Sequence, residues 1–109
     1  MKSRRHLGQI ELLALIAVMR LGDAAYGVAI ANEIENAGGR RIALASLYLT
    51  LDRLEANGLV QSELGEPTPE RGGRAKTYFR VTARGIKEAR DARRLLSNIC
   101  NGVPALENL

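Results

Sequence analysis

The sequence is poor in the residues that build metal and nucleophilic sites. Its 109 residues include one cysteine, Cys100, one histidine, His6, and no tryptophan. A single cysteine excludes an internal disulfide, and neither residue has a partner for a metal site or a thiolate–imidazole pair. We therefore expect a protein that is not an enzyme, binds no cofactor and has no tryptophan-lined effector site. Cys100 is interpreted as a small buried apolar residue rather than as a redox sensor or an intersubunit disulfide.

Long apolar runs are also missing. The longest one, Leu12 to Met19, has eight residues and lies between Glu11 and Arg20. A membrane-spanning helix needs about 20 residues, and no signal-peptide pattern is present. We expect a soluble, cytoplasmic protein with no membrane-spanning segment, of a length that suits one domain with one modest core.

Positive charge is concentrated in one segment. Between Arg71 and Arg94 there are nine Lys or Arg residues against Glu88 and Asp91, so this segment has a net charge of +7. Because the whole chain carries +4, the remainder carries −3. Charge separated in this way predicts a basic face for nucleic acid or an anionic surface rather than for a small neutral substrate.

Apolar periodicity predicts three helices in the first half of the chain. The first, about 7–21, is apolar nearly all round, which predicts that its second face meets another subunit. The second runs from about Tyr26 to Ala37. The third runs from about Ala45 to Asn57, capped by Ser46 or by the backbone just before it, with Leu47, Leu51 and Leu54 toward the core and Gly58 as its C-terminal cap.

Two segments with strand composition follow, Val60 to Leu64 and Lys76 to Val81, and together they predict a β-hairpin, which we call the wing. The wing tip, Arg71 to Lys76, reads Arg-Gly-Gly-Arg-Ala-Lys and offers cations on a flexible turn to a polyanion. Taken alone, the same tip is more typical of a solvated turn.

A final helix is predicted from about Thr82 to Cys100, ended by Gly102 and Pro104. Its small and apolar residues follow a 3,4,3,4 spacing, which is typical of a short coiled-coil seam and predicts a dimer. Together with the outer face of the first helix, the predicted dimer interface comprises Leu12, Ile16, Met19, Ala89, Ala92, Leu96, Ile99 and Val103.

Four motifs together resemble the PadR family of transcriptional regulators, over about 7–96. They are Tyr26-Gly27-Val28-Ala29-Ile30, Ser46-Leu47-Tyr48, Leu51-Asp52-Arg53-Leu54-Glu55 with Gly58-Leu59-Val60, and Gly72-Gly73-Arg74 with the segment from Tyr78 to Gly85. The resemblance implies a mainly α fold with a small β-hairpin: a winged helix-turn-helix over 1–82, a C-terminal dimerisation helix over 83–104 and a frayed tail over 105–109.

The resemblance further implies a homodimeric repressor that binds a pseudopalindromic operator on double-stranded DNA and is released by a small-molecule effector or another signal. In such a protein the third helix enters the major groove and the wing contacts the minor groove and the backbone. The predicted DNA-binding residues are Arg40, Arg41, Ser46, Tyr48, Leu49, Thr50, Arg53, Arg71, Arg74 and Lys76, with Arg74 as the candidate for minor-groove insertion.

Two positions depart from the family pattern. Ala45 and Leu49 stand where members usually carry Gly before and Pro after the Ser-Leu-Tyr motif. Leu49 is expected to point away from the core, where it meets a thymine methyl group or is simply exposed.

Several alternatives stay open at this stage. Arg53 is either a DNA contact or a salt-bridge partner of Asp52 or Glu55, and Tyr78 is expected to pack the wing against the body. At the level of function, the alternatives to a DNA-binding dimer are a winged-helix module for protein contacts and a binder of RNA or an anionic surface.

Overall fold

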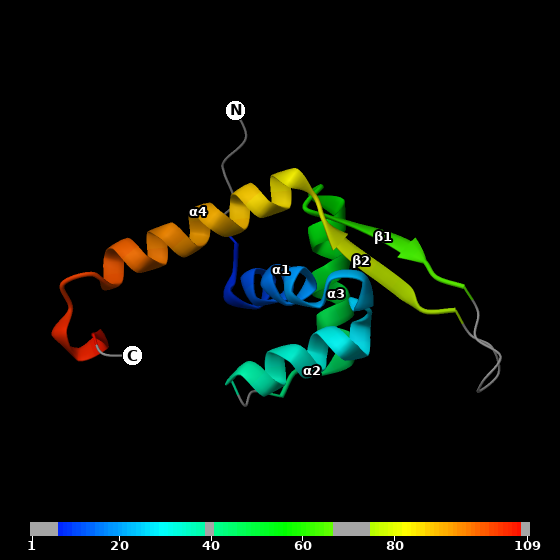
Figure 1. Cartoon of the computed structure of the whole chain (residues 1–109), viewed down its shortest axis with the longest axis horizontal. Helices are drawn as coiled ribbons and strands as arrows, with labels where there is room; N and C mark the ends of the chain where they lie inside the picture. The colour runs from blue at the N-terminus through cyan, green and yellow to red at the C-terminus, as the bar shows by residue number, and fades with distance from the viewer. Residues whose placement is uncertain (1–6, 39–40, 67–74, 108–109) are drawn as a thin grey trace.

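The computed structural model describes residues 7–38, 41–66 and 75–107. These residues form four α-helices and one two-stranded antiparallel sheet, arranged as a helical body from which a hairpin and a long terminal helix extend in different directions (Figure 1). In chain order the elements are α1 (Gln9–Leu21), η1 (Gly22–Ala24), α2 (Gly27–Gly38), α3 (Leu44–Ala56), β1 (Val60–Leu64), β2 (Thr77–Val81), α4 (Ala83–Cys100) and η3 (Pro104–Leu106).

Helix α1 is the central element of the body. Its Leu15 and Ala14 are fully buried, and α2, α3, α4 and β2 all pack against it. At the start of the helix, the Glu11 carboxylate accepts a hydrogen bond from the Gly8 N–H at 2.7 Å. The helix ends at Leu21, and its C-cap residue Gly22 has a φ of +59°. The contact of the outer face of α1 with another subunit stays a prediction, since Leu12 and Ile16 are half-buried and Met19 is exposed.

Helix α3 presents the expected apolar stripe to the core. Leu47, Leu51 and Leu54 are fully buried. Gly58 follows the helix with a φ of +79°, and the N–H groups of Gly58 and Leu59 donate to the carbonyls of Glu55 and Leu54. This arrangement satisfies the last carbonyls of the helix, as a glycine C-cap should.

The start of α3 differs from the prediction. The N-cap residue is Ala43, and no side chain among the described residues caps the helix there, so the assignment of Ser46 as cap is wrong. Ser46 lies inside the first turn, where its carbonyl accepts a hydrogen bond from the Thr50 hydroxyl at 3.0 Å.

The wing has the predicted alternation and one additional partner. β1 and β2 pair antiparallel with Ser62 opposite Phe79, and Phe79 is buried toward the body while Arg80 is exposed. On the other edge of β2, the Phe79 N–H donates to the Ala25 carbonyl at 2.8 Å, and Tyr26 forms an isolated bridge with Tyr78. Ala25 and Tyr26, between α1 and α2, therefore pair with the free edge of β2. The periodicity of the sequence did not indicate this pairing.

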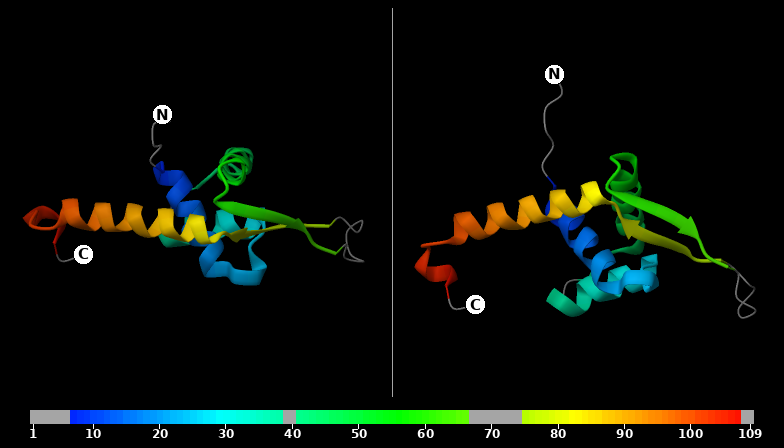
Figure 2. Two further views of the ribbon diagram at one scale, coloured as in Figure 1. Left: turned by 90° about the horizontal axis from the view of Figure 1, so that it is seen from above. Right: turned by 45° about the horizontal axis from the view of Figure 1, so that its top comes forward.

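Helix α4 has the predicted bounds and is tied to the α3–β1 turn by its first residues. The Thr82 hydroxyl donates to the Gly58 carbonyl at 2.8 Å and accepts from the Gly85 N–H at 3.0 Å, while the Thr82 N–H donates to the Leu59 carbonyl at 3.0 Å. From this junction α4 runs past α1, and its C-terminal half extends beyond the body (Figures 1 and 2).

Two residues of the predicted seam lie elsewhere. Ala89 is buried in the core of its own chain, because the first half of α4 packs on α1. Val103 follows the end of α4, since Gly102 adopts a φ of +80° and breaks the helical spacing on which its assignment depended. The predicted frayed tail is partly ordered, because Pro104–Leu106 form the turn η3.

Within the described ranges, none of the helices combines the length and the apolar character that crossing a bilayer requires.

We predict that Gly85→Ala lowers the free energy of unfolding by about 1–3 kcal/mol, because an added Cβ would overlap the Leu59 carbonyl and the Val81 side chain. The matched control is Gly38→Ala at the end of α2, where an added Cβ meets nothing within 4 Å and the change should stay within about 0.5 kcal/mol. Urea unfolding measures both. Equal effects of the two substitutions would contradict the close approach of α4 to the α3–β1 turn.

Candidate nucleic-acid interface

The outer face of α3 is open to solvent. Leu49 is 62% exposed and Tyr48 is 40% exposed, and Ala45, Ser46 and Arg53 are exposed as well. Leu49 therefore points away from the core, as its position on the helix predicted. An exposed helical face preceded by a helix and a turn has the geometry of a recognition helix.

Thr50 does not belong to this face. It is only 6% exposed, and its hydroxyl is engaged by the Ser46 carbonyl. The expected flank of Ser46, Thr50 and Arg53 is thus wrong for Thr50, because a rotation of 100° per residue carries position 50 toward the core side of the helix. Thr50 is therefore buried, and its hydroxyl proton is used within the helix rather than offered to a phosphate.

Arg53 has no acidic partner within 4.0 Å among the described residues. The Glu55 carboxylate instead accepts hydrogen bonds from the Ser62 hydroxyl at 2.8 Å and from the Ser62 N–H at 3.2 Å. This pair joins the end of α3 to β1. Because the Glu55 carboxylate is bound to Ser62, the Arg53–Glu55 salt bridge that was the alternative to a DNA contact does not form here.

Tyr48 lies against the start of α2. A Cβ added at Gly27 would overlap the Tyr48 ring, so the absence of a side chain at Gly27 allows the ring to lie directly on the backbone there. The contact connects α2 to α3 and fixes the position of the Tyr48 ring on the edge of the exposed face.

Arg41 stands two residues before the N-cap of α3 with its side chain 87% exposed. Its nearest acidic atom is a Glu35 oxygen at 4.0 Å, which is a weak and solvated ion pair. Arg40 lies outside the described residues.

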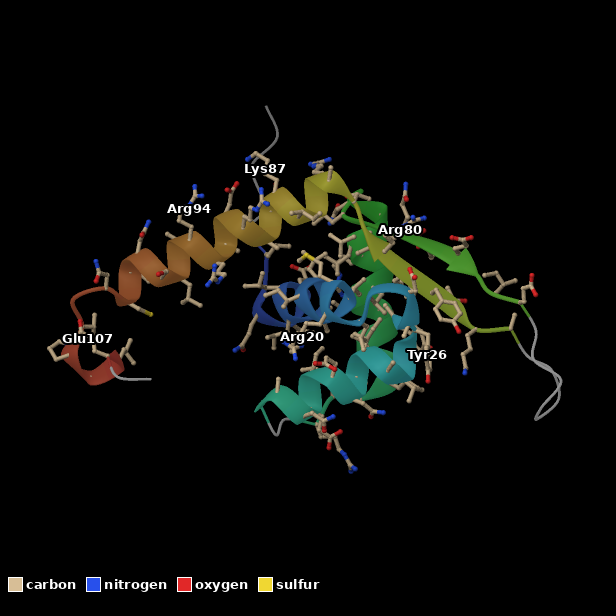
Figure 3. All side chains as sticks on the ribbon, in the orientation of Figure 1. Arg20, Tyr26, Arg80, Lys87, Arg94 and Glu107 are labelled. Atoms are coloured by element: carbon tan, nitrogen blue, oxygen red, sulfur yellow. The ribbon has the colours of Figure 1, made fainter. Side chains whose placement is uncertain are left out.

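The base of the wing is held to the body by aromatic contacts. The Tyr26 and Tyr78 rings meet edge to face with centroids 5.7 Å apart, and the Lys76 ammonium lies 4.5 Å from the centre of the Tyr26 ring. Tyr26 lies between α1 and α2, beside β2 (Figure 3). The packing role expected for Tyr78 is confirmed. Lys76 is exposed next to this pair, whereas Arg71 and Arg74 lie outside the described residues.

Two of these connections were missed by sequence reasoning. The contact of Tyr26 with Lys76 and Tyr78 and the hydrogen bonds of Glu55 with Ser62 each join segments that are separate in the chain. Periodicity reports only on one element at a time, so it carries no signal for such pairs.

The C-terminal half of α4 exposes large apolar side chains. Leu95, Leu96 and Ile99 are 58%, 57% and 70% exposed. Ala92 is half-buried, as are Leu12 and Ile16 of α1, whereas Met19 is 39% exposed. Lys87 and Arg94 lie on the side of α4 that faces away from α1 (Figure 3).

Helix-turn-helix, hairpin wing and terminal helix define a winged-helix protein. The family model described as the transcriptional regulator PadR-like family matches residues 15–91. The chain therefore belongs to the PadR-like family, a family of transcriptional regulators and not of enzymes, as its motifs indicated.

Solved structures agree with this assignment. A transcriptional regulator from Clostridium thermocellum is 26% identical with a TM-score of 0.73, and the similarity covers 90% of this chain and 89% of the other. A PadR family regulator from Eggerthella lenta is 28% identical with a TM-score of 0.67, covering 89% and 83%. One from Clostridium difficile, 22% identical with a TM-score of 0.68 and covering 86% and 96%, shows the same fold. No curated protein matches the sequence significantly.

We predict that Tyr78→Ala lowers the free energy of unfolding by about 1–3 kcal/mol, since it removes the edge-to-face contact with Tyr26 and the apolar area buried with it. Tyr78→Phe keeps the ring and should change stability by less than about 0.5 kcal/mol, because no hydrogen bond of the hydroxyl is present among the described residues. Urea unfolding separates the two. A large loss in the phenylalanine variant would show that the ring contact is not what holds the wing.

Proposed function

We propose that this regulator is a homodimeric repressor that acts in the cytoplasm and binds a pseudopalindromic operator on double-stranded DNA. The observation that carries the proposal is the exposed outer face of α3, together with a wing that is anchored to the body and has Lys76 exposed at its base. One recognition helix in the major groove and one wing on the adjacent backbone form each half of the complex.

Within each half, α3 contributes base contacts and its surroundings contribute phosphate contacts. The Ser46 hydroxyl and the uncapped N–H groups of the first turn point to the phosphate backbone, with Arg41 beside them. Arg53, two turns further along, and Tyr48 reach the groove from the exposed face. In the wing, Lys76 contacts the backbone, and Arg40, Arg71 and Arg74 keep the roles that the sequence predicts for them.

The apolar overhang of α4 supports the homodimer. Burying a leucine or isoleucine side chain stabilises an assembly by about 1.5–3 kcal/mol, so leaving Leu96 and Ile99 in water is costly when a second copy of the same surface can cover them. In such a dimer we expect the two α3 helices to lie about 34 Å apart, or a multiple of that distance, which is the spacing of successive major grooves on one side of DNA.

Repression follows if the dimer occupies a promoter, and a signal that changes the angle between the two subunits would release it. Such a signal acts through the α4 contact, since α4 joins the dimer interface to the α3–β1 turn. The identity of an effector is not part of the proposal.

For the dimer we predict that Ile99→Asp raises the dissociation constant by at least about 30-fold, as expected when a central apolar contact is replaced by a charge. Asn98→Asp adds the same charge one residue away, rotated by about 100° around α4, and should leave the dimer intact. Analytical ultracentrifugation measures both. A stable Ile99→Asp dimer would place the interface elsewhere.

For DNA binding we predict a steep dependence of affinity on salt. The slope of log affinity against log salt concentration should be smaller by about one unit in each of Arg41→Ala and Lys76→Ala, because each substitution removes one phosphate contact. The charge-matched control is Lys87→Ala, because Lys87 lies on α4 and pairs with Asp91 at 2.9 Å. Fluorescence anisotropy with duplex DNA from the region flanking the gene, at several salt concentrations, gives the slopes.

The same assay distinguishes the alternatives. Equal affinity for RNA, random duplex or anionic vesicles would favour a general polyanion binder. Absence of any nucleic-acid binding would favour a winged-helix module for protein contacts.

A further inference from the structure

The N-terminal half of the recognition helix has no side chain that could make the paired hydrogen bonds by which guanine and adenine are usually read. Residues 44–51 read Leu-Ala-Ser-Leu-Tyr-Leu-Thr-Leu, without Arg, Lys, Asn, Gln, Asp or Glu. Arg or Lys reads guanine, and Asn or Gln reads adenine, through paired hydrogen bonds in the major groove. Because recognition helices insert their N-terminal residues first, this part of α3 needs another means of discrimination.

Apolar side chains occupy that part of the helix surface. Leu49 is 62% exposed, and Leu44 is 39% exposed. Leu49 is not part of the buried core of its own chain, whereas its neighbours Leu47 and Leu51 are fully buried. An apolar group opposite Leu49 would bury this side chain and stabilise the complex.

We infer that Leu49 reads the 5-methyl group of a thymine in each half of the bound site. The methyl group of thymine is the one apolar group that an unmodified base pair presents in the major groove. Ala45 lies four residues before Leu49 on the same face of α3, and its small side chain lets the helix approach the base edges closely. This inference rests on the proposed DNA-binding function and names the base that the helix selects.

The charges around the apolar face favour DNA over a protein as its occupant. Arg53 continues the same stripe four residues after Leu49, and Arg41 stands before the helix, both exposed. Asp52 is also exposed beside Arg53 and is placed to accept a hydrogen bond from a cytosine or adenine amino group. An apolar patch between two exposed arginines matches base edges between two phosphate strands.

The test uses the full chain and a duplex that it selects from a randomised pool. Each thymine of that duplex is replaced singly by deoxyuridine, which removes only the methyl group. For the unmodified protein, one or two replacements in each half-site should raise the dissociation constant about fourfold, the effect of losing one buried methyl. The variant Leu49→Ala should bind the thymine duplex more weakly and show no further loss with deoxyuridine at those positions.

Leu106→Ala is the control, because Leu106 is an exposed leucine of η3, far from α3 (Figure 1), and its variant should keep the full response to deoxyuridine. If the chain selects a duplex but tolerates deoxyuridine everywhere, or if Leu49→Ala keeps the fourfold loss, the inference is wrong and the DNA-binding function stands. If Leu49→Ala changes the oligomeric state instead, the face binds a second copy. If no duplex is selected, the proposed function fails together with the inference.

Discussion

The structure depends on the turn between α3 and β1. Gly58, at a φ that glycine adopts readily, ends α3 and lets Leu59 return to the core, where it is 5% exposed. The carbonyls of these two residues accept the hydrogen bonds of Thr82, and Gly85 lies so close to the Leu59 carbonyl that no side chain fits between them. One short segment thus fixes the recognition helix, the wing and the terminal helix relative to one another.

This junction explains how a small chain positions two separate contact surfaces. The wing is held on one side by the hydrogen bonds of Glu55 with Ser62 and on the other by the Tyr26–Tyr78 contact, so α3 and the wing form one unit (Figure 1). Helix α4 starts from the same turn and carries its exposed apolar residues beyond the body. In the proposed dimer, the angle of α4 therefore determines where each recognition helix meets the DNA.

Much of the fold was predictable because it follows from local chemistry. The Leu47, Leu51 and Leu54 stripe, the glycine cap at Gly58 and the alternation around Phe79 each depend on neighbours within one element. The failures have three causes, which are the rotation of a residue within its helix, packing between elements, and the end of a helix. Thr50 lies on the core side of α3, and Ala89 is buried in the core of its own chain. Val103 lies outside the helix, because Gly102 ends the helical spacing before it. The links through Tyr26 and Glu55 were not predictable, since they join segments distant in sequence.

In the proposed complex a two-fold pair of these units reads DNA through α3. Protection mapping on the DNA flanking the gene tests it most directly. We expect two protected half-sites related by a pseudo-two-fold axis, with centres about 34 Å apart or a multiple of that, and protection in the major groove of each. A single protected half-site, or uniform protection without symmetry, would contradict it.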